Sequence, residues 1–172
     1  SFTVKALDNV EMPPKNREEK VRFQKELAKL EAEFAIVQNM LSESRKKVRY
    51  INAAIKRAEQ PLAPLLSEVM SIEKQLDDVQ LALYGDPVKR RLDIDQEPSP
   101  ASRLGSIGYE QKYSTATPTQ THKDSYAIAK QQVKTIKSKM ERIFNETLKA
   151  LEKKLINSGA PYTPGRGYEN RN

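Results

Sequence analysis

The chain contains no cysteine and no tryptophan, and it is poor in glycine and in apolar residues. Without cysteine it cannot form disulfides, zinc–thiolate sites, iron–sulfur clusters or cysteine nucleophiles. Only 6 of its 172 residues are glycine, and 37% are hydrophobic. A compact α/β enzyme uses more glycine in its strand–helix turns, whereas long helices that each bury one stripe need few apolar residues. The composition therefore favours an elongated helical protein.

Two further features are missing from the sequence. No apolar run approaches the roughly 18 residues of a membrane span, and no signal peptide is visible. The chain begins at Ser1 rather than Met, which is compatible with a processed chain or with a piece of a longer one. Its net charge of +7 is spread: residues 1–60 and 122–172 are positive and residues 61–121 are negative. The positive charge is therefore not concentrated in one segment that would indicate a single binding site.

A heptad pattern dominates residues 16–59 and predicts a long helix there. Asn16 is the expected N-cap, with Glu18 and Glu19 in the first turn. The a/d spacing is interrupted once by a polar residue, Ser44. The positions with this spacing are Phe23, Leu27, Leu30, Phe34, Val37, Leu41, Ser44, Val48, Ile51, Ile55 and Ala58.

Pro61 and Pro64 interrupt the pattern before a second predicted helix over residues 64–84, which ends at Gly85. Either one kinked rod or a tight turn into an antiparallel helix is compatible with the spacing, and two prolines within four residues favour the turn. The heptads likewise allow an intramolecular bundle or a dimerising coiled coil. The internal partners favour the bundle.

Residues 85–121 are rich in proline, serine, threonine and glycine, which predicts a long loop. Apolar and aromatic residues nevertheless recur in it more often than in a disordered linker. We expect much of this loop to lie against the helices and to cover the part of the first helix that the shorter second helix leaves bare. Its apolar and aromatic residues are Val88, Leu92, Ile94, Leu104, Ile107, Tyr109 and Tyr113.

A third helix is predicted over residues 122–158, capped by Asp124 or Thr121 and ended by Gly159. Steps of 4-4 through Phe144 and Leu148 predict less regular packing there. The whole stripe is Tyr126, Ala129, Val133, Ile136, Met140, Phe144, Leu148, Leu151 and Leu155.

The two ends of the chain differ from its middle. Residues 1–14 alternate in polarity before two prolines, which predicts an entering strand or linker from a preceding domain, and residues 159–172 form a tail without helical period. The predicted fold class is all-α. We expect residues 15–158 to form an elongated, antiparallel up-and-down bundle of three helices, with four as the alternative.

No constellation of residues indicates catalysis. His122 has only Asp124 as a nearby carboxylate, so a capping or surface role is favoured. Asp77 and Asp78 are neighbours on a predicted helix, where side chains diverge by about 100°. Residues 93–97 lack the glycine and the distal glutamate of a calcium loop, and no nucleophile elbow or phosphate-binding glycine motif is present. We predict no catalytic, metal-binding or cofactor-binding residue and no cofactor.

Basic residues are the remaining candidates for a binding surface. They occur at positions 45–49 and 89–91, and Lys130, Lys134 and Lys137 share one helix face by their 4-3 spacing. Such a face can follow phosphates or lipid headgroups. Nucleic-acid modules usually add aromatic side chains for stacking, but the aromatic residues of the third helix fall on its apolar stripe. A solvated face is favoured, with a nucleic acid or an anionic membrane as the alternative partner.

Several short motifs resemble the C-terminal region of large secreted bacterial proteins with sortilin-type, BNR-repeat β-propellers, which are described as glycosyl-hydrolase-like. The likeness also includes an entering strand followed by a helix with Phe23 and Gln24. The motifs are Ser102-Arg103-Leu104, Thr117-Pro118-Thr119, Ser125-Tyr126 and Gly159-Ala160-Pro161-Tyr162-Thr163-Pro164-Gly165-Arg166-Gly167.

The resemblance implies a helical appendage that follows the propeller and a small β-sandwich. It also implies a periplasmic, secreted or cell-surface setting, and processing of a polymer or carbohydrate by the parent protein. Propeller repeats are absent from this chain, so no catalytic residue is carried over.

These observations predict a non-catalytic structural or interaction domain at the C-terminus of a larger secreted protein. Its partners would be the preceding domains of the parent or another protein. The alternative is a basic helical module that binds nucleic acid or an anionic membrane. The candidate interaction surface lies in the long loop and in the tail, at Arg103, Tyr109, Tyr113, Tyr162, Arg166 and Tyr168.

Overall fold

The computed structural model describes residues 2–3, 16–58 and 62–164, and all regular structure in these ranges is helical. The elements are α1 (Arg17–Lys56), α2 (Ala63–Tyr84), α3 (Pro87–Arg91), α4 (Pro100–Tyr113), α5 (Gln120–Arg142), the π-helical turn η1 (Ile143–Thr147) and α6 (Leu148–Asn157). The predicted all-α bundle is therefore confirmed. The strand predicted over residues 1–14 lies outside the described residues, except for residues 2–3, which form no strand.

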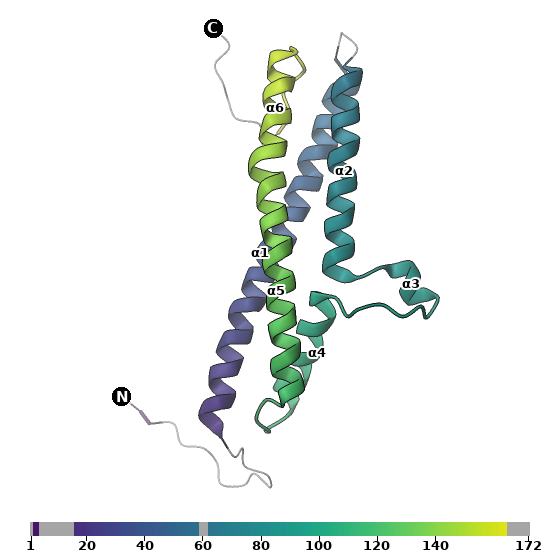
Figure 1. Cartoon of the computed structure of the whole chain (residues 1–172). Coiled ribbons are helices and arrows are strands. Elements are labelled where there is room, and N and C mark those ends of the chain that lie inside the picture. Colours follow the sequence, from purple (N-terminus) through teal and green to yellow (C-terminus); the bar gives the residue numbers. More distant parts are fainter. Residues whose placement is uncertain (1, 4–15, 59–61, 165–172) are drawn as a thin grey trace.

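The helices form a rod with three legs (Figure 1). Helix α1, of 40 residues, is about 60 Å long and runs the length of the rod. Helix α2 returns beside the C-terminal half of α1, and α4 continues the descending leg beside its N-terminal half. The third leg, α5 with η1 and α6, runs back up and contacts both of the others. Each leg thus covers the apolar stripes of the other two.

Helix α2 runs antiparallel to α1, as the turn favoured by the two prolines predicts. Gln38 of α1 donates to the hydroxyl of Tyr84 at 2.7 Å, and Arg45 of α1 forms an ion pair with Asp77 at 2.6 Å. The partner of the later residue of α1 lies earlier in α2, so the two helices are antiparallel. Pro64 lies in the first turn of α2, where its missing N–H leaves no helical hydrogen bond unmade.

The prediction of a loop over residues 85–121 is wrong, because the helices α3 and α4 lie entirely inside it. The side chain of Asp86 accepts the backbone N–H groups of Val88 and Lys89, and Ser99 accepts that of Ser102. A proline follows each of these caps, at Pro87 and Pro100. Prolines that look like helix breakers in the sequence are helix initiators here, because the first turn needs no backbone donor.

The expected covering role is correct for α4 and wrong for α3. Leu104 and Ile107 of α4 are buried in the core, where α4 packs on α1 and α5. Helix α3 instead stands away from the rod (Figure 1). Its apolar side chains remain in contact with water, and they form the arm described below.

The third leg starts earlier than predicted and contains a π-helical turn. Its N-cap is Thr119, not Asp124 or Thr121. Within the turn Ile143 is buried, whereas Phe144, the predicted stripe residue, is only partly buried. The buried positions thus step from Ile143 directly to Leu148, five residues on, which an α-helix cannot place on one face. The π turn absorbs the extra residue and realigns the stripe.

The ion pairs between α1 and the third leg also show the one extra residue at the π turn. Below the π turn, Glu19 pairs with Lys123 and Glu33 pairs with Lys137, each 104 positions further along the chain. Above it, Lys47 pairs with Glu152, which is 105 positions further. These pairs show that α1 and the third leg are parallel. In the pairs below the turn α1 supplies the carboxylate, and in the pair above the turn α1 supplies the ammonium group.

The core is one cluster that extends along the whole rod, so the heptad stripe is buried within a single chain. Ser44, the polar interruption of the heptads, is fully buried, and no hydrogen-bond partner for its hydroxyl occurs among the described residues. Gly159 ends the last helix in a left-handed conformation, as predicted, and Ala160 returns to the core. No described helix is both long and apolar enough to cross a membrane.

Candidate interaction site

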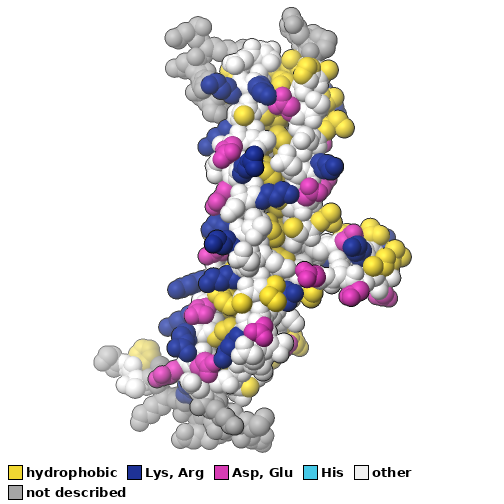
Figure 2. Space-filling model, viewed as in Figure 1, with side chains coloured by type: hydrophobic (Ala, Val, Ile, Leu, Met, Phe, Trp, Pro, Cys, Tyr) yellow, Lys and Arg dark blue, Asp and Glu magenta, His cyan; other side chains and the backbone are white. Residues whose placement is uncertain are grey.

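The most distinctive surface feature is a projection formed by residues 86–97, here called the arm. It leaves the rod after α2, contains α3, and returns to the start of α4 (Figure 1). Figure 2 shows hydrophobic side chains gathered at its tip, with charged side chains around them. The arm therefore presents apolar groups to solvent at a distance from the core.

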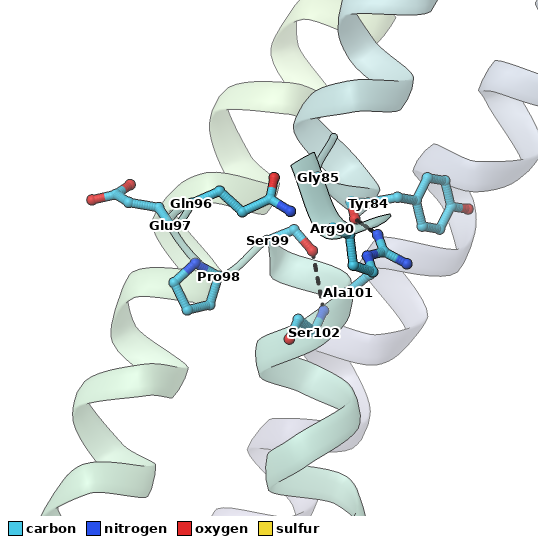
Figure 3. Close-up of a pocket in the computed structure, with 9 residues that line it drawn as sticks. All are labelled: Tyr84, Gly85, Arg90, Gln96, Glu97, Pro98, Ser99, Ala101 and Ser102. Atoms are coloured by element: carbon cyan, nitrogen blue, oxygen red, sulfur yellow. Dashed lines mark hydrogen bonds between the residues drawn. The ribbon is translucent and has the colours of Figure 1, made fainter. Parts of the chain in front are cut away.

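The base of the arm is held by the side chain of Gln96. Its carbonyl accepts the backbone N–H of Asp86 at 2.9 Å, and its amide donates to the backbone carbonyl of Asp86 at 3.2 Å. Gly85 adopts a φ of 77°, and a Cβ there would lie 3.2 Å from the Gln96 carbonyl oxygen. Arg90 closes the other side by donating to the carbonyl of Tyr84 at 2.7 Å (Figure 3). The two ends of the arm are thus joined by paired hydrogen bonds.

The tip of the arm exposes three aliphatic side chains. Val88 of α3 and Leu92, the residue that caps the C-terminal end of α3, are each 62% exposed, and Ile94 is 50% exposed. Ile94 is held beside α3 because its N–H donates to the carbonyl of Lys89 at 2.9 Å. The local backbone turns at Asp93, whose φ of 50° is the only positive value among the described non-glycine residues. The tip is a small apolar patch on a defined backbone.

Charge is divided between the two sides of the arm. The outgoing side carries Lys89, Arg90 and Arg91, and the returning side carries Asp93, Asp95 and Glu97. Arg90 is used at the base, which leaves the exposed Lys89 and Arg91 as the cations nearest the apolar patch. The surface is therefore mixed in sign rather than basic.

A cleft of about 550 Å³ lies where the arm meets α4 (Figure 3). Two of its polar side chains have structural roles, since Arg90 donates to the Tyr84 carbonyl and the Ser99 hydroxyl caps α4. Neither serine has a histidine among the residues that line the cleft. The cleft is lined by Tyr84, Gly85, Arg90, Gln96, Glu97, Pro98, Ser99, Ala101 and Ser102. These lining residues include no serine–histidine pair of the kind that activates a nucleophile.

A second cleft of about 520 Å³, here called the α2–α5 cleft, lies on the rod beside the returning side of the arm. It is mainly apolar at its base, with Glu97 and two glutamines among its lining residues. Its lining residues are Ala82, Glu97, Ile128, Gln131, Gln132, Thr135 and Ile136. Gln132 donates to the carbonyl of Pro98 at 3.4 Å, but its own buried carbonyl oxygen has no partner among the described residues.

The predicted interaction residues do not form one surface. Tyr109 and Tyr113 of α4 lie together, with ring centroids 4.8 Å apart and 68% of each side chain exposed. Arg103 instead donates to the Pro98 carbonyl at 3.1 Å and to Ser125 at 3.5 Å, which joins α4 to α5. Tyr162 follows α6, at the opposite end of the rod from the end of α4 (Figure 1). Arg166 and Tyr168 lie outside the described residues.

The sequence did contain a signal for the arm. Leu104 and Ile107 continue to Gln111 at helical spacing, and all three are buried. The apolar residues at 88, 92 and 94 are instead separated from one another by charged residues. Helical spacing of apolar residues thus distinguishes the covering helix α4 from the projecting arm. The prediction of one loop over residues 85–121 did not use this difference.

His122 has the capping role that the sequence favoured. Its backbone N–H donates to the Thr119 hydroxyl at 3.2 Å, and its Nδ1 accepts the Thr119 N–H at 3.2 Å. Its Nε2 lies 2.5 Å from a carboxylate oxygen of Glu110. The imidazole therefore joins the end of α4 to the start of α5. No group of three or more His, Cys, Asp or Glu in the described parts of the chain can hold a metal ion.

The two adjacent aspartates of α2 also have structural partners. Asp77 pairs with Arg45 of α1 at 2.6 Å, and Asp78 approaches Lys139 of α5 at 3.8 Å. Their side chains thus diverge toward two different helices, as their neighbouring positions on a helix require. They do not converge on a ligand.

Several candidate basic residues face acids across the bundle. Lys137 lies 3.9 Å from Glu33, and Lys130 lies over the Tyr126 ring, 5.9 Å from its centroid. The hydrogen bond and positive charge of Lys123 hold the pKa of Glu19 below its usual range. Pairs of this kind lower the net positive field of the α5 face. The basic-module alternative stays a prediction, with less support than the arm.

Comparison with protein-family profiles, with curated proteins and with solved structures finds no significant match to this chain. The resemblance to the C-terminal region of BNR-repeat propeller proteins therefore stays a prediction from short motifs.

Proposed function

We propose that this chain is a non-catalytic interaction domain, in which a rigid helical rod presents the arm to a protein partner. The observation that carries the proposal is the exposed apolar tip, Val88, Leu92 and Ile94, on an arm whose base is joined by paired hydrogen bonds. A protein that needed only a connection between α2 and α4 could use a short polar turn.

The energetics of the tip favour binding to a protein. Full burial of one such aliphatic side chain contributes about 1.5–3 kcal/mol, so covering three side chains that are half or more exposed recovers several kcal/mol. Because Gln96 already holds the arm in shape, a partner does not have to order it. A pre-organised loop loses less conformational entropy on binding, which raises affinity.

The setting that the sequence resemblance implies is part of the proposal. In it, the rod is the C-terminal helical domain of a larger secreted or periplasmic propeller protein, and the partner is either a preceding domain or a separate protein. The gene sequence upstream of the codon for Ser1 tests this setting. Propeller repeats and a signal peptide would support it, and a start codon immediately before Ser1 would refute it.

Site-specific photo-crosslinking in cells that express the native gene tests the binding role of the arm. A photoreactive amino acid replaces Leu92 in one strain and Met70 in another. Met70 is the matched control, because it is also 62% exposed but lies on α2, away from the arm. We expect a defined protein adduct from position 92 and none from position 70. Absence of an adduct at position 92, or equal labelling at both positions, would refute the proposal.

A further inference from the structure

We propose that the partner of the arm is a second copy of this chain. In the resulting dimer, the tip of each arm occupies the α2–α5 cleft of the other protomer. This inference rests on the proposed binding role of the arm and specifies what the arm binds.

The position of the cleft beside the arm makes this exchange reciprocal. Glu97 is the last residue of the arm and also lines the α2–α5 cleft, so each protomer carries a tip and a cleft on the same side of the rod. When two arms lie antiparallel, the tip of each reaches the base of the other. One twofold axis then generates both contacts, which is the usual symmetry of a homodimer.

The apolar groups of tip and cleft match in kind. The tip offers Val88, Leu92 and Ile94, and the cleft offers the exposed Ala82 and Ile128 above the buried Ile136. Ile128 is 45% exposed in the single chain, although it lies on a helix of the bundle. Contact between the two sets removes exposed aliphatic surface on both sides at once.

The polar groups also match. Lys89 and Arg91 are exposed next to the apolar tip, and the Glu97 carboxylate lies at the cleft. An ammonium or guanidinium group of the arriving tip can therefore pair with this carboxylate.

Charge also argues against a membrane as the occupant of the tip. Asp93, Asp95 and Glu97 follow the basic side of the arm within a few residues. An anionic lipid surface would repel these carboxylates while it attracted Lys89 and Arg91. A second copy presents both signs and therefore fits the mixed surface better.

Two small contacts of this kind bury less surface than the interfaces of permanent dimers. We therefore expect a dissociation constant of about 1–100 µM. Sedimentation velocity of the purified chain over a concentration series measures it. A sample that stays monomeric up to about 1 mM would overturn the proposal, since a contact weaker than that is not specific.

Three substitutions identify the surfaces. Leu92→Glu in the tip and Ile128→Glu in the cleft are each expected to weaken dimerisation by about tenfold or more. Met70→Glu, with the same exposed fraction as Leu92, is the control and is expected to leave it unchanged. All three positions are exposed, so the fold tolerates the charge, and circular dichroism checks this. Equal effects of all three substitutions, or no effect of the first two, would overturn the proposal.

Charge exchange adds a test that a misfolded variant cannot pass. Lys89→Glu brings two carboxylates together across the interface and is expected to weaken the dimer. Adding Glu97→Lys to the same chain restores an opposite pair in both contacts and is expected to recover affinity. A double variant that is as weak as the sum of the two single variants would overturn the pairing.

The outcomes separate this inference from the proposed function. If the wild-type chain is monomeric but position 92 crosslinks to a different protein, the second copy is refuted and the binding role of the arm stands. If the monomeric chain sediments with vesicles of phosphatidylcholine and phosphatidylserine in a way that depends on Leu92, a membrane is the occupant and the dimer is refuted. If position 92 gives no adduct of any mass, both proposals fail.

Discussion

The π-helical turn predicts that one residue can be removed from the third leg without loss of the fold. Deletion of Asn145, an exposed residue of η1, leaves the buried positions Met140, Ile143 and Leu148 at regular heptad spacing. The helix can then be α-helical throughout, with α6 in its present position. We expect the free energy of unfolding to change by about 1 kcal/mol or less, as for a typical surface change.

Deletion of Lys134 is the matched control, because this residue is also exposed but lies in regular α-helix. After this deletion, the residues between position 135 and the π turn are rotated by about 100° around the helix axis relative to the core. Beyond that point the register is restored, because the π turn can become α-helical and absorb the missing residue. Ile136, Met140 and Ile143 lie in the rotated segment and leave the core. At about 1.5–3 kcal/mol each, their exposure costs roughly 5–9 kcal/mol, which is most of the stability of a typical domain.

Urea unfolding followed by far-UV circular dichroism measures both variants against the wild-type chain. The midpoint gives the change in stability, and an unchanged slope shows that the same surface unfolds. If the deletion of Asn145 costs about 3 kcal/mol or more, or if the two deletions cost the same, the π turn does not act as a one-residue insertion.

Three further predictions concern α4, the arm and one titrating group. Ile107→Ala is expected to cost about 2–5 kcal/mol and to lower the melting temperature by about 5–15 °C, whereas Tyr109→Ala, on the exposed side of α4, should leave it nearly unchanged; equal effects would contradict the covering role of α4. Gln96→Ala removes both hydrogen bonds to Asp86, so trypsin should cut the arm faster while the melting temperature of the rod stays the same; an unchanged cleavage rate would show that Gln96 does not hold the arm. Burial, helped by the nearby charges of Glu26 and Glu33, raises the pKa of Tyr126. A raised pKa in the folded state contributes stability that is complete below the unfolded value of about 10 and is lost as the pH rises through the folded value. The stability difference between wild type and Tyr126→Phe should therefore stay level up to about pH 9 and fall as the pH rises past about 10; a difference that does not fall above about pH 10 would be inconsistent with a raised pKa.

Much of the architecture follows from periodicity, which is a local property of the sequence. The stripe from Phe23 to Ile55 is buried as the heptads predict, and Pro64 lies in the first turn of the antiparallel helix α2. Asn16 and Gly159 mark helix ends for reasons that lie within one turn of the chain. These features could be predicted from the sequence, because a capping hydrogen bond or a buried stripe is formed by residues that are close in sequence.

The candidate interaction site was only partly predictable. Tyr109 and Tyr113 are exposed together, but Arg103 is used between α4 and α5. The apolar residues at 88, 92 and 94 were expected to lie against the helices and form the tip of the arm instead. Whether an apolar residue in a proline-rich segment is covered depends on where that segment stands relative to the other helices. Spacing within the segment does not contain that information.

The sequence alone determined that this is a heptad-packed, all-helical rod, because stripes, caps and prolines act over a few residues. Tertiary structure decided how the legs pair. It set α1 parallel to the third leg with an offset that changes from 104 to 105 at the π turn, since that register depends on ion pairs and packing between distant segments. It also decided that α4 completes the bundle while α3 leaves it. Leu104 and Ile107 of α4 are buried in the core, whereas no residue of α3 is buried.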